Sequence, residues 1–154
     1  IYEKVLGDEH IETAGSYRDI GLVYYAQGNY SKALEYYFKS LDISIKVLDD
    51  EHKDVVILYN SIGNVYYAQG NYSAALEYHL KSLEIYKKVL GDEHVDTATS
   101  YNNIGAVYYV QGLYSEALEY LTKAEAAFSK IYGEENESLQ QIRFNIQDTK
   151  NRLK

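Results

Sequence analysis

Three histidines are the residues best suited to chemistry, because each of them follows an Asp-Glu pair. His10, His52 and His94 recur at intervals of 42 residues. A zinc ion holds its ligand nitrogens at about 2 Å, whereas neighbouring packed helices lie about 10 Å apart. Three histidines on three successive structural units therefore cannot share one ion. We expect them to lie in connections or helix caps, and we predict no metal site.

The other polar residues form no recognisable catalytic set. No carboxylate pair lies in a predicted apolar pocket of the kind that shifts a pKa for acid–base work. The serines have no candidate base at a suitable spacing, cysteine is absent, and no glycine-rich phosphate loop of known spacing occurs. His79 aligns with Tyr37 and Leu121 and is expected in the core. We therefore expect no enzyme and no cofactor.

The charge balance bears on the class of partner. The chain has 15 Lys and Arg against 23 Asp and Glu, a formal net charge of −8. Nucleic acids and anionic membrane surfaces are bound through clustered cations, so we expect neither as a partner. No apolar run approaches the roughly 18 residues of a membrane span, and the lack of cysteine suits a reducing compartment. The composition favours a cytoplasmic protein.

The chain is organised in repeats. The phrase GLVYYAQGNY at 21–30 returns as GNVYYAQGNY at 63–72 and as GAVYYVQGLY at 105–114. Residues 17–58 and 59–100 are identical at 27 of 42 positions, so the repeat is the unit of structure. We predict a single domain over 1–154. It comprises the end of a truncated preceding repeat (1–9), three repeats (about 10–51, 52–93 and 94–135) and a C-terminal capping helix (136–154).

Each repeat contains two helical patterns. In the first pattern, Tyr17, Ile20, Gly21 and Tyr24 form an apolar stripe at the helical period, and residues 30–48 carry a second such stripe. Gly-Asn dipeptides at 28–29 and 70–71 are typical of turns. The DDEH and GDEH stretches are expected to connect one repeat to the next. An all-α fold of helix-turn-helix units follows.

The helix ends are predicted from capping residues. A serine lies near the start of each second helix, where its hydroxyl could cap the helix. An acidic residue falls in the first turn of each first helix, where the helix dipole favours negative charge. The serines are Ser31, Ser73 and Ser115, and the acidic residues are Glu12, Asp54 and Asp96.

One glycine in each first helix predicts close packing of the helices. A glycine inside a helix destabilises it by about 1 kcal/mol relative to alanine. Glycine at the same position of all three repeats is explained if another backbone approaches the helix closely there. An alanine in each second helix supplies the matching small surface. The glycines are Gly21, Gly63 and Gly105, and the alanines are Ala33, Ala75 and Ala117. We expect these positions to pack the two helices of a repeat tightly.

The spacing Gly-x-x-Tyr-x-x-x-Gly-x-Tyr-x-x-Ala, at 21–33, 63–75 and 105–117, resembles the tetratricopeptide repeat signature. The usual period of that family is about 34 residues, and the longer period here is similar to that of kinesin light chains. HEAT and armadillo repeats have a comparable length but lack this spacing. A proline of the kinesin light chain pattern is replaced here by Ile11, Lys53 and Val95, so the start of the first helix is less sharply set.

The resemblance implies a right-handed superhelical solenoid whose concave wall is formed by the first helices. The last segment, 137–153, matches the start of a fourth repeat with Gln147 at the glycine position, as expected of a terminal capping helix. By repeat position, the wall is expected to be Arg18, Leu22 and Tyr25, then Asn60, Asn64 and Tyr67, then Asn102, Ala106 and Tyr109. Asparagine and tyrosine suit a peptide backbone and its side chains.

Two functional hypotheses remain. The first is a protein-interaction scaffold that binds a peptide of a protein partner in the concave groove. Only Arg18 on that wall is basic, so a ligand held by its terminal carboxylate is not expected. The second is a structural repeat array, a natural fragment or a consensus-like sequence, that self-associates end to end without a dedicated ligand. The first full helix (about 11–27) would then expose a face that is normally covered.

Overall fold

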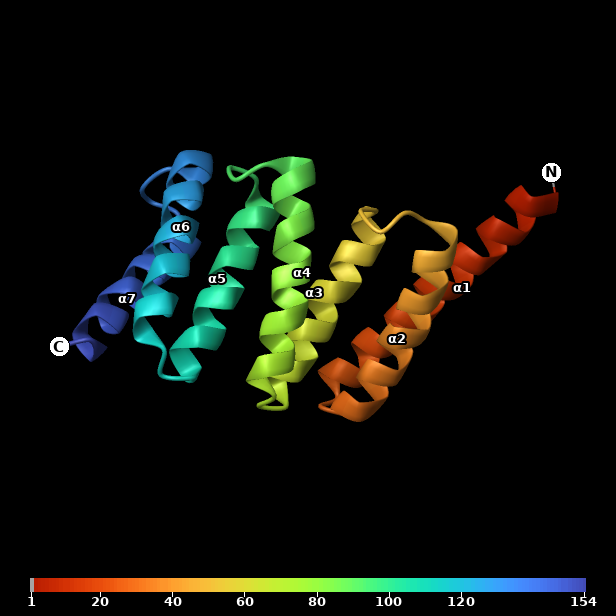
Figure 1. The fold of residues 1–154 in the computed structure, drawn as a ribbon, viewed down its shortest axis with the longest axis horizontal. Coiled ribbons are helices and arrows are strands. Elements are labelled where there is room, and N and C mark those ends of the chain that lie inside the picture. The colour runs from red at the N-terminus through yellow and green to blue at the C-terminus, as the bar shows by residue number, and fades with distance from the viewer. Residues whose placement is uncertain (1) are drawn as a thin grey trace. The chain divides into compact units, whose positions relative to one another are not determined.

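Paired α-helices make up the part of the chain that the structure describes. The computed structural model describes the backbone of residues 2–154 and the side chains of residues 10–154. Within this range there are seven helices and no strand (Figure 1), as the all-α prediction requires. They are α1 (Tyr2–Ala26), α2 (Tyr30–Val47), α3 (Lys53–Ala68), α4 (Tyr72–Leu90), α5 (Val95–Val110), α6 (Tyr114–Tyr132) and α7 (Glu137–Arg152). The chain divides into two compact units, Ile1–Tyr78 and His79–Lys154.

Asparagine caps the second helix in the first two repeats. Asn29 precedes α2, and its side-chain oxygen accepts a hydrogen bond from the backbone N–H of Lys32 at 3.3 Å. Asn71 accepts the corresponding bond from Ala74, also at 3.3 Å. In the third repeat Leu113 takes this place, and α6 has no side-chain cap.

The prediction that serines cap these helices was therefore wrong. Each serine is already the second residue of its helix, at Ser31 in α2, Ser73 in α4 and Ser115 in α6. A capping side chain must lie just before the helix, from where it reaches the N–H of the third helical residue. The preceding Gly28 and Gly70 have φ values of 74° and 77°, which glycine adopts without strain.

Two of the three repeat connections agree with the sequence prediction. His52 and His94 precede α3 and α5, and the Nδ1 atom of each accepts a hydrogen bond at 3.2 Å from the backbone N–H of Asp54 or Asp96. Both aspartates lie in the first helical turn, as expected. These two histidines are therefore helix caps.

The first connection differs from the prediction. Helix α1 runs unbroken from Tyr2 to Ala26, so the GDEH stretch at 7–10 is helical and does not form a connection. His10 is consequently no cap, and Glu12 lies inside a helix instead of in its first turn. The same four letters at 91–94 form a turn in which Gly91 has a φ of 83°. The same local sequence therefore permits both conformations.

The core of the first unit joins α2 to α3. Its buried residues come from α2 (Ala33, Tyr37 and Leu41) and from α3 (Val55, Leu58, Ile62 and Val65). Burying aliphatic side chains of this size contributes about 1.5–3 kcal/mol each. The core therefore fixes how the end of one repeat meets the start of the next within this unit.

Ring clusters account for the abundance of tyrosine. In the first unit, Tyr36 of α2 packs between Tyr17 and Tyr24 of α1, with ring centroids 5.9 and 5.5 Å apart. The ammonium group of Lys39 lies 4.8 Å from the centre of the Tyr36 ring. In the second unit Tyr120 packs in the same way between Tyr101 and Tyr108. Such aromatic pairs add about 0.5–1.5 kcal/mol beyond burial.

The glycines of the repeats lie where helices approach closely. A Cβ atom added to Gly21 would lie 2.7 Å from Tyr37 Cδ1 and 3.3 Å from the backbone oxygen of Ala33. At Gly105 it would lie 2.9 Å from Leu121 Cδ2. Gly63 is buried, and the alanines at the matching positions (Ala33, Ala75 and Ala117) are fully buried.

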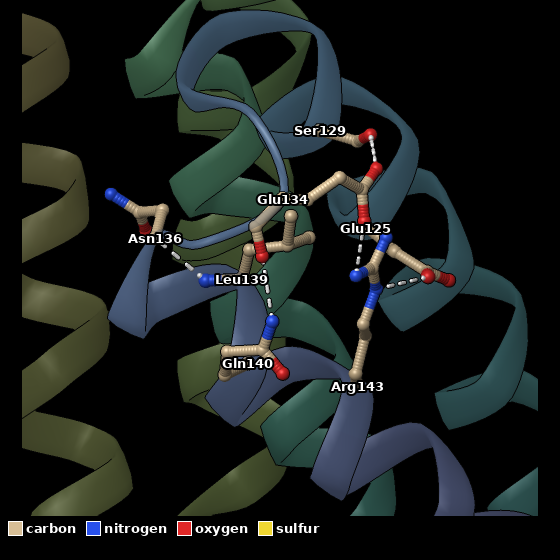
Figure 2. Close-up of polar contacts among 7 residues, drawn as sticks. All are labelled: Glu125, Ser129, Glu134, Asn136, Leu139, Gln140 and Arg143. Carbon is tan, nitrogen blue, oxygen red and sulfur yellow. Dashed lines mark hydrogen bonds and ion pairs between the residues drawn. The ribbon is translucent and has the colours of Figure 1, made fainter.

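Helix α7 is held on α6 by a network of polar contacts (Figure 2). The Arg143 guanidinium lies 3.0 Å from Glu125 Oε1 and 2.5 Å from Glu134 Oε2. Gln140 donates a hydrogen bond to the backbone oxygen of Glu134 at 2.6 Å, and Asn136 caps α7 by accepting from Leu139 N. Below this network Leu139 is fully buried. Polar and apolar contacts together dock the last helix on its own chain.

Candidate functional site

The nine residues of the predicted wall lie on three equivalent helices. Arg18, Leu22 and Tyr25 belong to α1, Asn60, Asn64 and Tyr67 to α3, and Asn102, Ala106 and Tyr109 to α5. On each helix the spacing is i, i+4, i+7, so the three side chains share one face. Leu22 and Tyr67 are exposed, at 57% and 36%, and Tyr25 is half-buried. Apolar and aromatic surface is therefore accessible on the face of α1 and α3.

Each wall tyrosine packs against the first tyrosine of the following helix. The ring centroids of Tyr25 and Tyr30 lie 5.9 Å apart, and those of Tyr67 and Tyr72 lie 5.7 Å apart. Partial burial, and after it the neighbouring Tyr72, raises the pKa of Tyr67. The phenol is therefore a neutral hydrogen-bond donor at physiological pH. Rings held in this way lose little conformational freedom when a ligand covers them.

The third wall tyrosine is engaged by the last helix. Tyr109 packs on Tyr114, with centroids 5.5 Å apart, and its hydroxyl donates a hydrogen bond to the Asp148 carboxylate of α7. This hydrogen bond, followed by burial, raises the pKa of Tyr109. The Arg152 guanidinium lies 5.9 Å from the centre of the Tyr109 ring and 3.8 Å from Asp148. Helix α7 thus supplies two charged groups beside this ring.

Sequence reasoning missed that the wall positions continue onto α7. Phe144 occupies the register of Asn102, and Asp148 occupies the register of Ala106, each 42 residues later. Phe144 is 67% exposed, the highest value among the large apolar side chains of residues 10–154. Extending the period to the capping helix would have found both positions.

Asn102 carries an unsatisfied acceptor. Its side-chain oxygen is buried and has no hydrogen-bond partner among residues 10–154. An unpaired buried acceptor costs about 1–3 kcal/mol.

The single cation of the predicted wall is already partly neutralised. Arg18 Nε lies 3.6 Å from Asp19, and Arg18 Nη1 lies 3.7 Å from Asp54 on α3. An arginine flanked by two carboxylates attracts an anionic ligand weakly. Arg18 therefore links α1 to α3 through Asp54.

The histidines do not come together. His52 and His94 are helix caps, His10 is exposed on α1, and His79 is buried with 2% exposure. Burial lowers the pKa of His79 to about 4, so it is a neutral core residue at pH 7. Among residues 10–154 no three His, Asp or Glu side chains are grouped to hold a metal ion.

None of the helices in the described range combines the length and the apolar character that a membrane-spanning segment needs.

The paired helices and their repeated glycine, tyrosine and alanine positions define a helical repeat protein. The chain belongs to the tetratricopeptide repeat family, since the family model matches residues 1–46 and 54–130. The prediction from the 42-residue signature is thereby confirmed. Proteins of this family are in general scaffolds for protein interactions.

Solved structures show the same fold. BtubC (BKLC) from P. vanneervenii is similar with a TM-score of 0.85 and 22% identity, covering 91% of this chain and 56% of BtubC. A putative kinesin light chain from Podosopora anserina with nearly identical TPR-like repeats has a TM-score of 0.82 and 23% identity, covering 94% and 68%. The N-terminal domain of stress-induced protein-1 from C. elegans has a TM-score of 0.68 and 16% identity, covering 92% and 97%. The comparison with curated proteins found no match.

Proposed function

We propose that the chain is a non-catalytic scaffold in the cytoplasm that binds a peptide segment of a partner protein on the wall face of α1 and α3. The observation that carries this proposal is the pairing of half-exposed, pre-packed tyrosines with asparagines one turn away, as at Tyr67 and Asn64 on α3. Tyrosine gives contact area at low entropic cost, and asparagine both donates to and accepts from a peptide backbone.

Truncating Asn64 and Tyr67 together is expected to abolish peptide binding. The variant loses the contact of the Tyr67 ring with the peptide and the hydrogen bonds of the Asn64 amide. The free energy of binding is expected to weaken by about 3 kcal/mol, which is more than a hundredfold in affinity. The ligand would be a peptide selected from a random displayed library against the wild-type protein, and its affinity would be measured by calorimetry.

The matched control is a double truncation of Ser31 and Glu35, which are exposed on α2 of the same unit. This variant is expected to bind as the wild type does. If selected peptides bound the Asn64 and Tyr67 variant with unchanged affinity, they would not use the wall, and the proposal would fail.

A second function, a structural array that self-associates, is favoured by the exposed face of α1. Ile20 and Val23 are 38% and 56% exposed, whereas their counterparts on α3, Ile62 and Val65, are fully buried under α2. A helix resembling α2 would cover Ile20 and Val23 in the same way. A second copy of the chain is one source of such a helix.

Replacing Val23 by glutamate is expected to suppress this association. A charge on the apolar face would have to be desolvated when a second copy packs there. Light scattering over a concentration series should show a mass that rises with concentration for the wild type and stays monomeric for Val23→Glu. A wild-type protein that is monomeric at every concentration would exclude the array.

A further inference from the structure

A cavity of about 260 Å³ lies between α1, α2 and α3 in the first unit. Ala14 and Leu58, which are 4% and 1% exposed, supply its apolar surface. Ser40 and Ser44 of α2 supply hydroxyl groups, and Arg18 and Asp54 lie at its more exposed side. Because Arg18 is a wall residue, the cavity adjoins the proposed peptide surface.

The cavity exists because two residues of the first repeat are smaller than their counterparts. Ser44 occupies the register of Tyr86 and Phe128, and Gly15 occupies the register of Ile57 and Thr99. A Cβ atom added to Gly15 would meet no atom within 4 Å. Phe128, in the second unit, is only 7% exposed, so an aromatic ring at this register is packed inside the protein. The first repeat therefore lacks a ring that the later repeats carry.

The polar groups of the cavity are not fully used by the protein. Ser44 is 3% exposed, and no hydrogen bond involves its hydroxyl within the part of the chain that the structure describes. The Ser40 hydroxyl, by contrast, donates to the backbone oxygen of Ala14 at 2.7 Å. The buried side-chain oxygens without a partner among residues 10–154 are Ser82 Oγ and Asn102 Oδ1. The Ser44 hydroxyl lines the cavity and is therefore accessible to a ligand with a hydrogen-bonding group.

In the second unit, the position equivalent to Ser44 is occupied by Tyr86. The Tyr86 side chain is half-buried. Burial raises the pKa of Tyr86, and the nearby Asp96 carboxylate adds to the rise. Asp96 is the counterpart of Asp54, which lines the cavity of the first unit. This register therefore already accommodates a phenol ring in the neighbourhood of an aspartate carboxylate.

We propose that the cavity between Gly15, Ser44 and Asp54 is a binding site for a phenol ring, supplied by a tyrosine side chain of the partner peptide. The ring replaces the missing aromatic side chain on Ala14 and Leu58. Its hydroxyl donates a hydrogen bond to the Asp54 carboxylate, and the Ser44 hydroxyl is available to the peptide backbone. The peptide part of this inference rests on the proposed function, whereas the phenol site can be tested without it.

The direct probe is 4-fluorophenol, observed by fluorine NMR with the full chain. Saturable binding is expected with a dissociation constant of about 1 mM, the scale for a ligand of this size. Fluorobenzene, which lacks the hydroxyl, is expected to bind about tenfold more weakly. Absence of saturable binding of 4-fluorophenol, or equal binding of both probes, would overturn the proposal.

Filling the cavity is the first test by mutation. Ser44→Tyr introduces the residue that the second repeat has, so 4-fluorophenol affinity is expected to fall at least tenfold. Ser31→Tyr adds the same side chain at an exposed position of α2 outside the cavity and is the matched control, with the affinity of the wild type. A Ser44→Tyr protein that binds the probe as the wild type does would disprove the site.

A transplant keeps the inference testable if Ser44→Tyr does not fold. Thr99→Gly with Phe128→Ser reproduces the two small residues of the first repeat in the third repeat, within the second unit, where Ser138 takes the place of Asp54. It is expected to add a second site for 4-fluorophenol, which the stoichiometry reports. An unchanged stoichiometry of one would contradict the role of these two positions.

An experiment with a peptide distinguishes the proposed peptide binding on the wall from the proposed tyrosine site in the cavity. A library peptide that loses affinity on Asn64 and Tyr67 truncation is tested against Ser44→Tyr, and its own tyrosines are replaced by alanine. At least a tenfold loss in both experiments supports a tyrosine in the cavity. If the wall variant loses binding but Ser44→Tyr and the peptide substitutions do not, the proposed function stands and the peptide tyrosine is excluded.

Discussion

Gly21→Ala is expected to destabilise the protein, whereas Gly15→Ala on the same helix is expected to stabilise it. Both changes gain about 1 kcal/mol of helix propensity. At Gly21 the new methyl group would lie 2.7 Å from the ring of Tyr37, which is 2% exposed and cannot move away freely. Overpacking of this kind costs about 1–3 kcal/mol. The net loss at Gly21 is up to about 2 kcal/mol, against a gain of about 1 kcal/mol at Gly15.

Thermal and urea unfolding followed by circular dichroism measure both changes. For a chain of this size 1 kcal/mol corresponds to about 2–4 °C in Tm, so the two variants should differ by several degrees in opposite directions. Gly15 is the matched control because a Cβ atom there meets no neighbour within 4 Å. Equal stability of the two variants would show that close approach is not the reason for glycine at position 21.

The stability of the protein is expected to fall between pH 6.5 and pH 4 because of His79. Burial lowers its pKa from about 6.5 to about 4. In this window the unfolded state binds a proton that the folded state does not, so the free energy of unfolding decreases as the pH is lowered. The loss by pH 4 amounts to about 3 kcal/mol.

His79→Leu is expected to remove this dependence, since Leu121 occupies the same register in the third repeat. Unfolding by urea at steps of half a pH unit would give the free energy of unfolding for both proteins. Below the window the lowered pKa values of Glu35 and Glu134 add their own loss of stability. That part is common to both proteins. A wild-type curve parallel to that of His79→Leu between pH 4 and 6.5 would contradict a neutral buried histidine.

Most of the helical framework could be predicted from periodicity. The stripe through Tyr17, Ile20 and Tyr24 and the Gly-Asn turn dipeptides set the helix pairs, because these signals are local. The capping serines were wrong because the decisive residue, Asn29, lies just before the helix, and a shift of two positions is within the usual uncertainty of helix ends. The helical GDEH stretch at 7–10 could not be predicted, since the same letters at 91–94 form a turn.

For the candidate site, the sequence could predict only which residues share a helix face. The period places Asn64 and Tyr67 on one face of a helix, and it would also have placed Phe144 if extended to the last helix. The ring contacts, the engagement of Tyr109 by Asp148 and the unpaired oxygen of Asn102 depend on side-chain conformations that no spacing specifies. The cavity at Ser44 is harder still, because a small residue gives a void only when its neighbours fail to fill the space.

Because Leu113 replaces the capping asparagine, the turn between α5 and α6 is the least stabilised of the three turns within repeats. The repeats with Asn29 and Asn71 each hold the first turn of their second helix by a side-chain hydrogen bond, and α6 has none. The absence of such a cap destabilises the helix by about 1 kcal/mol. The Leu113 side chain is 43% exposed, so a protease that cleaves next to leucine can bind it. Fraying should therefore begin at 113–115, and digestive proteases with a preference for leucine should cut the native chain first at this turn.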